Sequence, residues 1–491
     1  MNEHLVLTIA LPLLGAFLLP IIMRSSLAMG VWIGPVILGY GCWILANLWL
    51  HGNEQPFSIA IGGFAPPLGI NLYVDAMALL FAFATQLLGL IFWPFRLDQD
   101  TPKRQALMLL LVASSTGLAL SGDLFNLYVF YELVAVSTFG LIAASSSSAA
   151  YVATIRYLIL SGIGSVLTLF GIALIYAQTG TLNLAHLAQL APDQLNNDLG
   201  LAAFLAILIG IGVKAELFPV NTWVPEVYAT AASRLSAFLA GLVSKLSMLI
   251  ILRLLLLIFH QPEATQVILI LGILGVISGE FAAWRAKDMR RMLAFSSIGQ
   301  LGVIFIAVAL PDERGVLAVL ALSLHHMLIK SGLFMLADHW GGSLERLRGI
   351  ATTSPLAAGL FVLFALSLVG MPPLPGFWAK FTLITELAGQ TDPLYMIGLL
   401  VFLLATVIEA SYLFRVAAKM YQTKPTDIVR SNSPDSGSLS LTTASLFGAG
   451  LIAATVMVSP LGDGLQAIAV QAQDVDLYIQ TVLQQPLGEG Q

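Results

Sequence analysis

Residues 199–258 read LGLAAFLAILIGIGVKAELFPVNTWVPEVYATAASRLSAFLAGLVSKLSMLIILRLLLLI. Lys214 and Lys245 lie deep inside apolar runs, and Pro219 and Pro225 interrupt the first of these runs. An ammonium group at the centre of a bilayer costs about 2.5–3.5 kcal/mol on insertion scales, so two such lysines in consecutive spans indicate a role. The stretch therefore predicts two membrane helices, one of them broken, that take part in ion movement.

The composition extends this prediction to the whole chain. Of its 491 residues, 58% are hydrophobic and only 10% are charged, and the mean hydropathy is +0.89, which excludes an ordinary soluble domain. One crossing needs about 20 apolar residues, so we expect an all-α polytopic membrane protein with about 14 transmembrane helices. The predicted spans lie near residues 5–23, 30–50, 72–95, 105–122, 123–144, 157–177, 199–232, 235–258, 265–284, 293–310, 315–338, 355–388, 394–422 and 440–460.

The basic residues predict the orientation of these spans, because Lys and Arg in short loops stay in the cytoplasm. Five of the 22 basic residues lie at predicted membrane depth, and 16 of the other 17 lie in loops that follow odd-numbered spans. Only Arg314 lies on the opposite side. We therefore expect a multi-pass protein of the inner (plasma) membrane whose two termini both face away from the cytoplasm.

The sequence contains no pattern that indicates a bound cofactor. The single cysteine, Cys42, excludes an internal disulfide and a cysteine-based metal or iron–sulfur site. No nucleotide, redox-cofactor or metal motif is present, and nothing indicates a nucleic-acid partner. We expect a transporter subunit rather than an enzyme, with no cofactor and no metal site.

The interrupted span at 199–232 has a physical explanation in its prolines. Proline has no N–H, so Pro219 and Pro225 are expected to leave the carbonyls of Ala215 and Asn221 without helical donors. Unwound backbone at membrane depth is tolerated only inside protein or along a water-filled cavity, and such breaks mark ion sites in transporters. The alternative is a plain proline kink without a role.

The span at 355–388 repeats this design, with Pro372, Pro373 and Pro375 ahead of Lys380. Five spans separate the two breaks, so each break enters the membrane from the opposite side. This arrangement is typical of an inverted-topology repeat, here spans 4–8 against spans 9–13. The expected division of the chain is 1–104 (spans 1–3), 105–258 (first repeat), 265–422 (second repeat) and 423–491 (span 14 and a polar tail).

Several acidic residues lie within predicted spans. Glu132 falls near mid-bilayer, where an acid usually pairs with a base or lies on an ion path, although it could serve only to hold the bundle. Glu216 is two residues from Lys214 and so projects elsewhere, either to a different partner or toward the break. Glu280 is interpreted as an anchor to the basic cluster that follows it. Glu409 could be an exit-side carboxylate or a structural partner of Arg415.

The span at 315–338 is the second polar centre. His326 and Lys330 are four residues apart and therefore share one helical face, whereas His325 points about 100° away. Histidine titrates near neutrality, which suits a proton relay.

Six segments in order resemble one known family: GDLFNLYVFYEL, GVKAELFPVNTWVPE, LVSKLSMLIILR, DMRRMLAFSSIGQLG, HHMLIKSGLF and GMPPLPGFWAKF. They look like the antiporter-like subunits shared by respiratory complex I, membrane-bound hydrogenases and multisubunit Mrp Na⁺/H⁺ antiporters. The first segment and the tail LQAIAVQAQDVDLYIQTVL look most like the D-type component of Mrp antiporters. The resemblance covers nearly the whole chain.

The resemblance implies a 14-helix core with two inverted five-helix repeats and a proton path along a central hydrophilic axis. It assigns roles to residues at matching motif positions: Glu132 and Lys214 as the coupling ion pair, Lys245 as the central relay lysine, His326 and Lys330 as the link through the second repeat, and Lys380 as the terminal relay group. Two positions depart from the family pattern. Asn221 stands where a histidine is usual, and Glu216 where a small or apolar residue is expected.

Three functions are compatible with these residues. The first is a proton-translocating subunit of a multisubunit monovalent cation (Na⁺)/H⁺ antiporter, with other membrane subunits as partners and protons and cations as substrates. The second is a proton-pumping subunit of a complex-I-like NADH:quinone oxidoreductase, a membrane hydrogenase or an inorganic-carbon uptake complex. The third is a membrane scaffold that keeps buried charges for packing.

Overall fold

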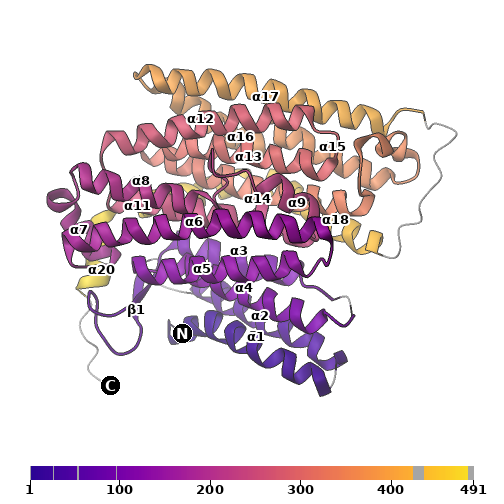
Figure 1. The fold of residues 1–491 in the computed structure, drawn as a ribbon. Coiled ribbons are helices and arrows are strands. Elements are labelled where there is room, and N and C mark those ends of the chain that lie inside the picture. Colours follow the sequence, from indigo (N-terminus) through magenta and orange to yellow (C-terminus); the bar gives the residue numbers. More distant parts are fainter. Residues whose placement is uncertain (1, 26, 52–54, 96, 424–435, 485–491) are drawn as a thin grey trace. The chain divides into compact units, whose positions relative to one another are not determined.

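The computed structural model describes residues 2–25, 27–51, 55–95, 97–423 and 436–484. Three of the basic loop residues counted above, Arg96, Lys424 and Arg430, lie outside the described residues, as do residues 424–435 and 485–491 of the predicted segment 423–491. Helices make up nearly all of the described chain (Figure 1). The chain forms two compact units: unit 1 comprises residues 1–213, 246–264 and 470–491, and unit 2 comprises residues 214–245 and 265–469.

Unit 1 is a helical bundle with one short hairpin. In this bundle α1 packs against α2 and α4, α4 packs against α5, and α6 packs against α8. The elements are η1 (Asn2–Val6), α1 (Leu7–Ser25), α2 (Leu27–His51), β1 (Phe57–Ala60), β2 (Asn71–Val74), α3 (Ala76–Ile91), α4 (Thr101–Leu120), α5 (Leu124–Ala143), α6 (Ser148–Thr179), α7 (Leu184–Gln194), α8 (Asp198–Gly212), most of α11 (Ser244–Leu257) and α20 (Val475–Leu483).

The hairpin of unit 1 corrects the predicted start of the third span. Strands β1 and β2 pair in antiparallel register from Phe57↔Val74 to Ala60↔Asn71, so the span begins after the hairpin and not at residue 72. Asp75 lies between β2 and α3 and accepts a hydrogen bond from the Ala78 N–H at 2.7 Å. This N-cap satisfies a free donor at the start of α3.

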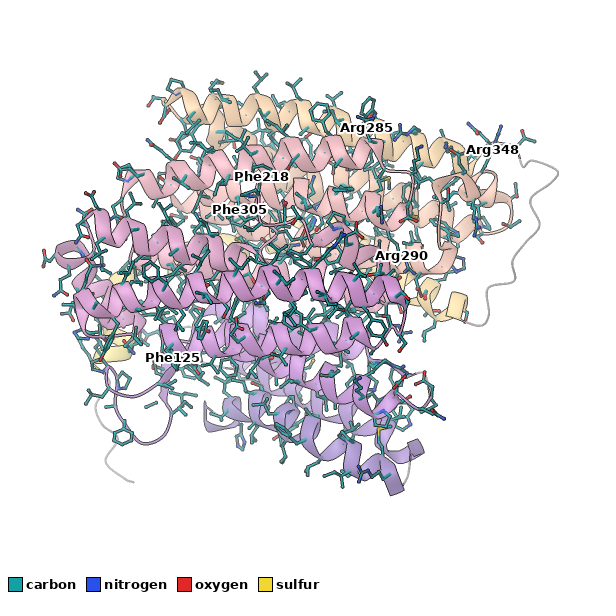
Figure 2. All side chains as sticks on the ribbon, in the orientation of Figure 1. Phe125, Phe218, Arg285, Arg290, Phe305 and Arg348 are labelled. Atoms are coloured by element: carbon teal, nitrogen blue, oxygen red, sulfur yellow. The ribbon has the colours of Figure 1, made fainter. Side chains whose placement is uncertain are left out.

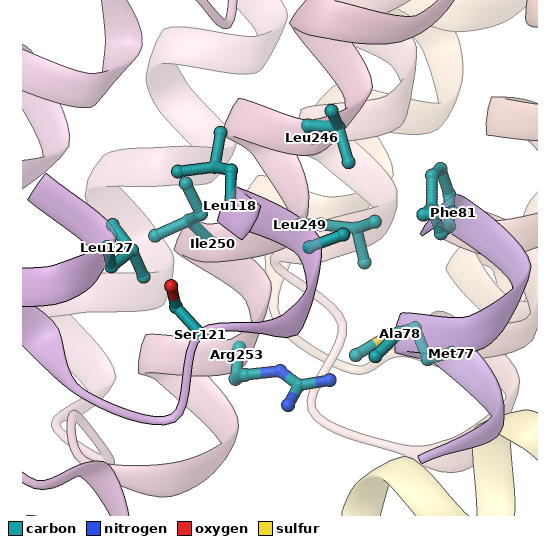
Figure 3. Close-up of a pocket in the computed structure, with 11 residues that line it drawn as sticks. Met77, Ala78, Phe81, Leu118, Ser121, Leu127, Leu246, Leu249, Ile250 and Arg253 are labelled. Atoms are coloured by element: carbon teal, nitrogen blue, oxygen red, sulfur yellow. The ribbon is translucent and has the colours of Figure 1, made fainter. Parts of the chain in front are cut away.

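Asp75 also holds Arg253 of α11 in a two-pronged ion pair, with both Asp75 oxygens 2.9–3.0 Å from the same guanidinium nitrogen. Arg253 lies over the rings of Tyr73 and Tyr478, the latter from α20. The Arg253 end of α11 also lines a pocket whose other walls are apolar apart from Ser121 (Figure 3). The described residues that line the pocket include no carboxylate that could bind a cation, and none of the predicted relay residues lines it.

Unit 2 is built around α14, which packs against α13, α15, α16 and α18 and against the turn η2. The elements are α9 (Val224–Thr230), α10 (Ser233–Phe238), the π-helical turn η2 (Leu239–Val243), most of α12 (Pro262–Arg285), α13 (Met289–Val308), α14 (Glu313–Trp340), η3 (Leu344–Leu347), η4 (Ile350–Thr352), α15 (Pro355–Val369), α16 (Pro375–Gly389), α17 (Pro393–Met420), α18 (Ser436–Val456) and most of α19 (Val458–Gln473). Figure 2 shows Arg285, Arg290 and Arg348 toward the end of this unit at which α12 and α17 end.

The predicted all-α membrane architecture is confirmed. Every predicted span overlaps a helix, and ten helices among the described residues are long and apolar enough to cross a membrane. Both predicted breaks are present, between α8 and α9 and between α15 and α16. The apolar helices that flank the breaks, Asp198–Gly212 and Pro355–Val369, are too short to cross alone.

Candidate functional site: a chain of buried ionisable side chains

The first break places Lys214 inside the protein. Helix α8 ends at Gly212, regular helix resumes only at Val224, and Lys214 between them is 1% exposed. Pro225 lies in the first turn of α9, where its missing N–H costs no helical hydrogen bond. The expectation that Pro225 would free the carbonyl of Asn221 is wrong, because this carbonyl accepts from the Val224 N–H at 3.1 Å.

Glu216 occupies an unusual backbone position in the same break. Its φ is +58°, in the left-handed region that non-glycine residues rarely adopt. The Asn221 side chain donates to the Glu216 carbonyl at 3.2 Å, and the Tyr228 hydroxyl donates to Glu216 Oε1 at 2.7 Å. Glu216 Oε2 is buried and has no hydrogen-bond partner among the described residues. The break thus holds a buried carboxylate in place although the backbone conformation of Glu216 is unfavourable.

Lys245 follows the π-helical turn η2. Its ammonium donates to the Ala240 carbonyl and to Ser244 Oγ, the latter at 3.1 Å, and its side chain is fully buried. A π turn inside an α-helix frees backbone carbonyls and is frequent at functional sites. Gly241 lets η2 approach α14 closely, since a Cβ there would lie 2.9 Å from Ser331 Oγ.

Helix α14 carries His325, His326 and Lys330, all buried. Lys330 donates to Ser296 Oγ at 2.7 Å and to the Leu293 carbonyl at 3.2 Å, both on α13. His325 faces elsewhere, as predicted, and its Nε2 is 2.9 Å from Ser367 Oγ on α15. His326 is 1% exposed, and neither ring nitrogen has a hydrogen-bond partner among the described residues. Buried polar atoms of this kind are usually satisfied by internal water.

The second break ends in an ion pair. Gly370 closes α15 at φ +92°, where glycine avoids the penalty of a Cβ, and α16 then begins at Pro375. Lys380 of α16 donates to Glu409 Oε2 of α17 at 2.7 Å. Gln300 of α13 donates to the other oxygen, Oε1, at 2.8 Å.

Glu409 therefore belongs to the site through Lys380. The alternative partner, Arg415, instead donates to the Trp284 carbonyl at 2.6 Å. The role of Glu409 on an exit path stays a prediction, but its pairing with Arg415 does not occur.

Sequence reasoning missed two parts of the site. Glu280 of α12 is 2% exposed and accepts from the Tyr412 hydroxyl at 3.1 Å, so its interpretation as an anchor to the basic loop is wrong. Helix α13 supplies Ser296 and Gln300, although its sequence contains no ionisable residue beyond its first turn. The signal for α13 was the small and polar run SSIGQLG inside an apolar helix.

Glu132 lies in unit 1, on α5, and is half-buried. Its Oε1 is buried without a hydrogen-bond partner among the described residues. Asp123 caps α5 by accepting from the N–H groups of Phe125 and Asn126 at 3.0 and 2.9 Å. The pairing of Glu132 with Lys214 stays a prediction. In the described part of the chain, no group of three or more His, Cys, Asp or Glu side chains is arranged to hold a metal ion.

Comparison with known proteins decides the family. Residues 121–408 match the family described as NADH:quinone oxidoreductase/Mrp antiporter, transmembrane. The chain belongs to this family. Among curated relatives, it is 32% identical to the N-type component of the NADH-quinone oxidoreductase of Desulforudis audaxviator, over 86% of this chain and 87% of that protein. It is 29% identical to the D-type component of the Na⁺/H⁺ antiporter of Bacillus subtilis, over 84% and 86% of the two chains.

The family fold is also recognised in three dimensions. A chain of the membrane-bound sulfane sulfur reductase, an archaeal respiratory membrane complex, aligns with a TM-score of 0.89 at 30% identity, over 98% of this chain and 100% of that one. The protein is thus a membrane antiporter-like subunit of the family that unites Mrp and complex-I-like complexes. Both antiporter and redox complexes are represented among these relatives.

Proposed function

We propose that this chain translocates protons along its buried ionisable side chains as one subunit of a multisubunit membrane complex. The observation that carries this proposal is the sequence of contacts through unit 2. Helix α13 contacts Lys330 through Ser296 and Glu409 through Gln300, and Glu409 pairs with Lys380. Charged groups at membrane depth are costly, so a connected series of them in one unit indicates a proton path.

The proposed order of transfer begins at the coupling pair, Glu132 and Lys214. A buried ammonium is stabilised by a nearby carboxylate and destabilised when that carboxylate moves away or is neutralised. Lys214 would then release its proton toward Lys245. Glu216 lies two residues from Lys214 in the same break, anchored by Tyr228, and is proposed as a further carboxylate of this step.

The second half of the path runs through α14 to the second break. His326 has two buried ring nitrogens and can accept a proton on one while donating from the other. Lys330, four residues along the same helical face, takes the proton next, and Lys380 is the terminal relay group beside Glu409. His325, held by Ser367, faces another neighbour and is proposed as a side branch. Spans 4–8 and 9–13 are proposed to form two inverted repeats around this path.

The proposed complex is a monovalent cation (Na⁺)/H⁺ antiporter of the Mrp type, in which this chain takes the place of the D-type component. Its partners would be the other membrane subunits, and it would reside in the plasma membrane with both termini outside the cytoplasm. The similarity to a component of an NADH-quinone oxidoreductase and to a sulfur-reductase complex favours a second candidate, a proton-pumping subunit of a redox-driven complex.

Everted membrane vesicles that contain the whole complex test the proposal. Respiration acidifies the vesicle interior, and addition of Na⁺, K⁺ or Li⁺ should then collapse the pH gradient if the complex is an antiporter. Glu132→Ala and Lys214→Ala should abolish this collapse while the complex assembles normally. Full activity in either variant would refute the relay, and a defect in assembly alone would favour the scaffold.

A redox-driven complex would give a different result in the same vesicles. The cations would leave the gradient unchanged, and an electron donor of the complex would generate the gradient in the parent but not in the variants.

A further inference from the structure

Glu280 is the buried acid of unit 2 to which the path above gives no role. It lies on α12, five residues before Arg285 at the end of that helix, and is 2% exposed. The Tyr412 hydroxyl of α17 donates to its Oε2 at 3.1 Å. Its Oε1 is buried and has no hydrogen-bond partner among the described residues.

The neighbouring helix is shaped to admit this carboxylate. A Cβ at Gly299 of α13 would lie 2.3 Å from Glu280 Oε1, far inside van der Waals contact. Glycine leaves room for the carboxylate in its present position, and a larger residue would require the end of the Glu280 side chain to move. The next residue, Gln300, donates to Glu409. Two adjacent residues of α13 therefore contact the two acids, Gly299 at Glu280 and Gln300 at Glu409.

Helix α17 links the same two acids from the other side. Tyr412, which holds Glu280, is three residues from Glu409 and therefore lies on the same helical face. The charged side chains whose fields reach Glu280 are Glu409 on α17, Lys330 on α14 and Lys380 on α16. Glu280 thus borders the Lys380–Glu409 pair without being part of it.

Resting on the function proposed above, we propose that Glu280 is a further proton-carrying residue, which connects the Lys380–Glu409 pair to the end of α12 that precedes the basic loop. A proton that arrives on Glu409 passes through a bridging water to the Glu280 carboxylate. Glu409 then returns to the carboxylate paired with the Lys380 ammonium, and Glu280 becomes a neutral acid until it releases the proton at that end. The reverse steps admit a proton from that side.

The position of Glu280 suits this role. It lies between the centre of unit 2 and the exposed Trp284 and Arg285 of the last turn of α12. Figure 2 shows Arg285, Arg290 and Arg348 toward this end of the unit. The branch therefore opens on the basic side of unit 2, which the distribution of Lys and Arg predicts to be cytoplasmic.

Glu280→Gln separates proton carriage from packing. Glutamine has the same shape, and its amide oxygen still accepts from Tyr412, but it cannot carry a proton. In vesicles that contain the whole complex, we expect this variant to assemble at the parent level and to transport protons at least about a hundredfold more slowly, the effect of losing one proton-transfer group. Glu280→Asp should restore part of the rate with a shifted pH profile, and Glu263→Gln, at the exposed start of the same helix, should behave as the parent.

Two neighbours provide independent variants. Gly299→Ala should displace the carboxylate and slow transport, whereas Tyr412→Phe should slow it less because the acid remains. Parent-like transport by Glu280→Gln would overturn the inference, as would a loss of transport that only follows a loss of assembled complex. Lys380→Met, with transport expressed per assembled complex, keeps the two proposals distinguishable. If it abolishes transport while Glu280→Gln does not, only the branch fails, and if neither affects transport, the relay itself fails.

Discussion

The Lys380–Glu409 pair permits a prediction that separates its contribution to stability from its contribution to transport. The two side chains are 6% and 1% exposed, and Nζ lies 2.7 Å from Oε2. Removing one partner of such a pair leaves an uncompensated buried charge and typically costs about 3–5 kcal/mol, whereas replacing both partners is often nearly neutral. We therefore expect Lys380→Met and Glu409→Gln each to lower the free energy of unfolding by about 3–5 kcal/mol.

The double variant should recover most of this loss. Once Lys380→Met has removed the ammonium, no charge remains to compensate, and the glutamine introduced by Glu409→Gln would keep an amide oxygen for the hydrogen bond that Gln300 donates at 2.8 Å. The double variant should nevertheless remain inactive in transport, because neither new side chain can carry a proton. Stability would thus return without function.

Pulse proteolysis of the purified complex in increasing urea measures the free energy of unfolding, with the surviving chain detected by an antibody. Collapse of the pH gradient in vesicles measures transport. The exposed pair Glu345 and Lys419 is the control, with side chains 76% and 26% exposed. Its removal should cost less than about 1 kcal/mol. A double variant as unstable as the single ones, or one that transports protons, would refute the reasoning.

Three further predictions concern other charged groups. Glu216→Gly and Glu216→Ala both remove the carboxylate that accepts from Tyr228 and should both lower transport, but only glycine relieves the left-handed backbone, so Glu216→Gly should be about 1 kcal/mol more stable than Glu216→Ala. Urea midpoints and vesicle assays compare them, and equal stability of the two would exclude backbone strain. The hydrogen bond and charge of Lys419 hold the pKa of Glu345 below its ordinary value of 4.5. The pair should therefore stabilise the folded chain by a few tenths of a kcal/mol above pH 4.5, and this stabilisation should be lost as the pH falls through the lowered pKa. A difference in thermal stability between parent and Glu345→Gln that persists below about pH 3 would contradict this prediction. Arg253→Met should leave Asp75 buried without its cation and cost about 3–5 kcal/mol, yet the assembled complex should transport normally, and a selective transport defect would place Arg253 on the path.

Three of the buried lysines of the proposed path have hydrogen-bond acceptors nearby. Lys245, Lys330 and Lys380 of unit 2 are each held by oxygen atoms from neighbouring backbone or side chains, so none of these ammonium groups is left in an apolar environment. Serine, glutamine and tyrosine supply contacts to the ionisable groups without adding charge. Such groups can stay in place while protons move between the ionisable residues.

The amino-acid sequence by itself determined the helical membrane class, the approximate positions of the spans and the two breaks. Hydropathy over about 20 residues and the missing N–H of proline act locally along the chain, so no tertiary information is needed to apply them. It also predicted that Lys245, Lys330 and Lys380 lie inside the protein, because a lysine within an apolar run is easily recognised in the sequence, and all three side chains are buried. Their roles as relay groups stay predictions.

Only the tertiary structure decided which groups meet. Glu409 is closer in sequence to Arg415 but pairs with Lys380, and Glu280 is closer to Arg285 but faces Tyr412 and Gly299. The reason is that side-chain partners in a helical bundle are set by the rotation and packing of neighbouring helices, which sequence separation does not encode. The same packing holds the left-handed Glu216 and gives α13, which is uncharged beyond its first turn, its contacts with both Lys330 and Glu409.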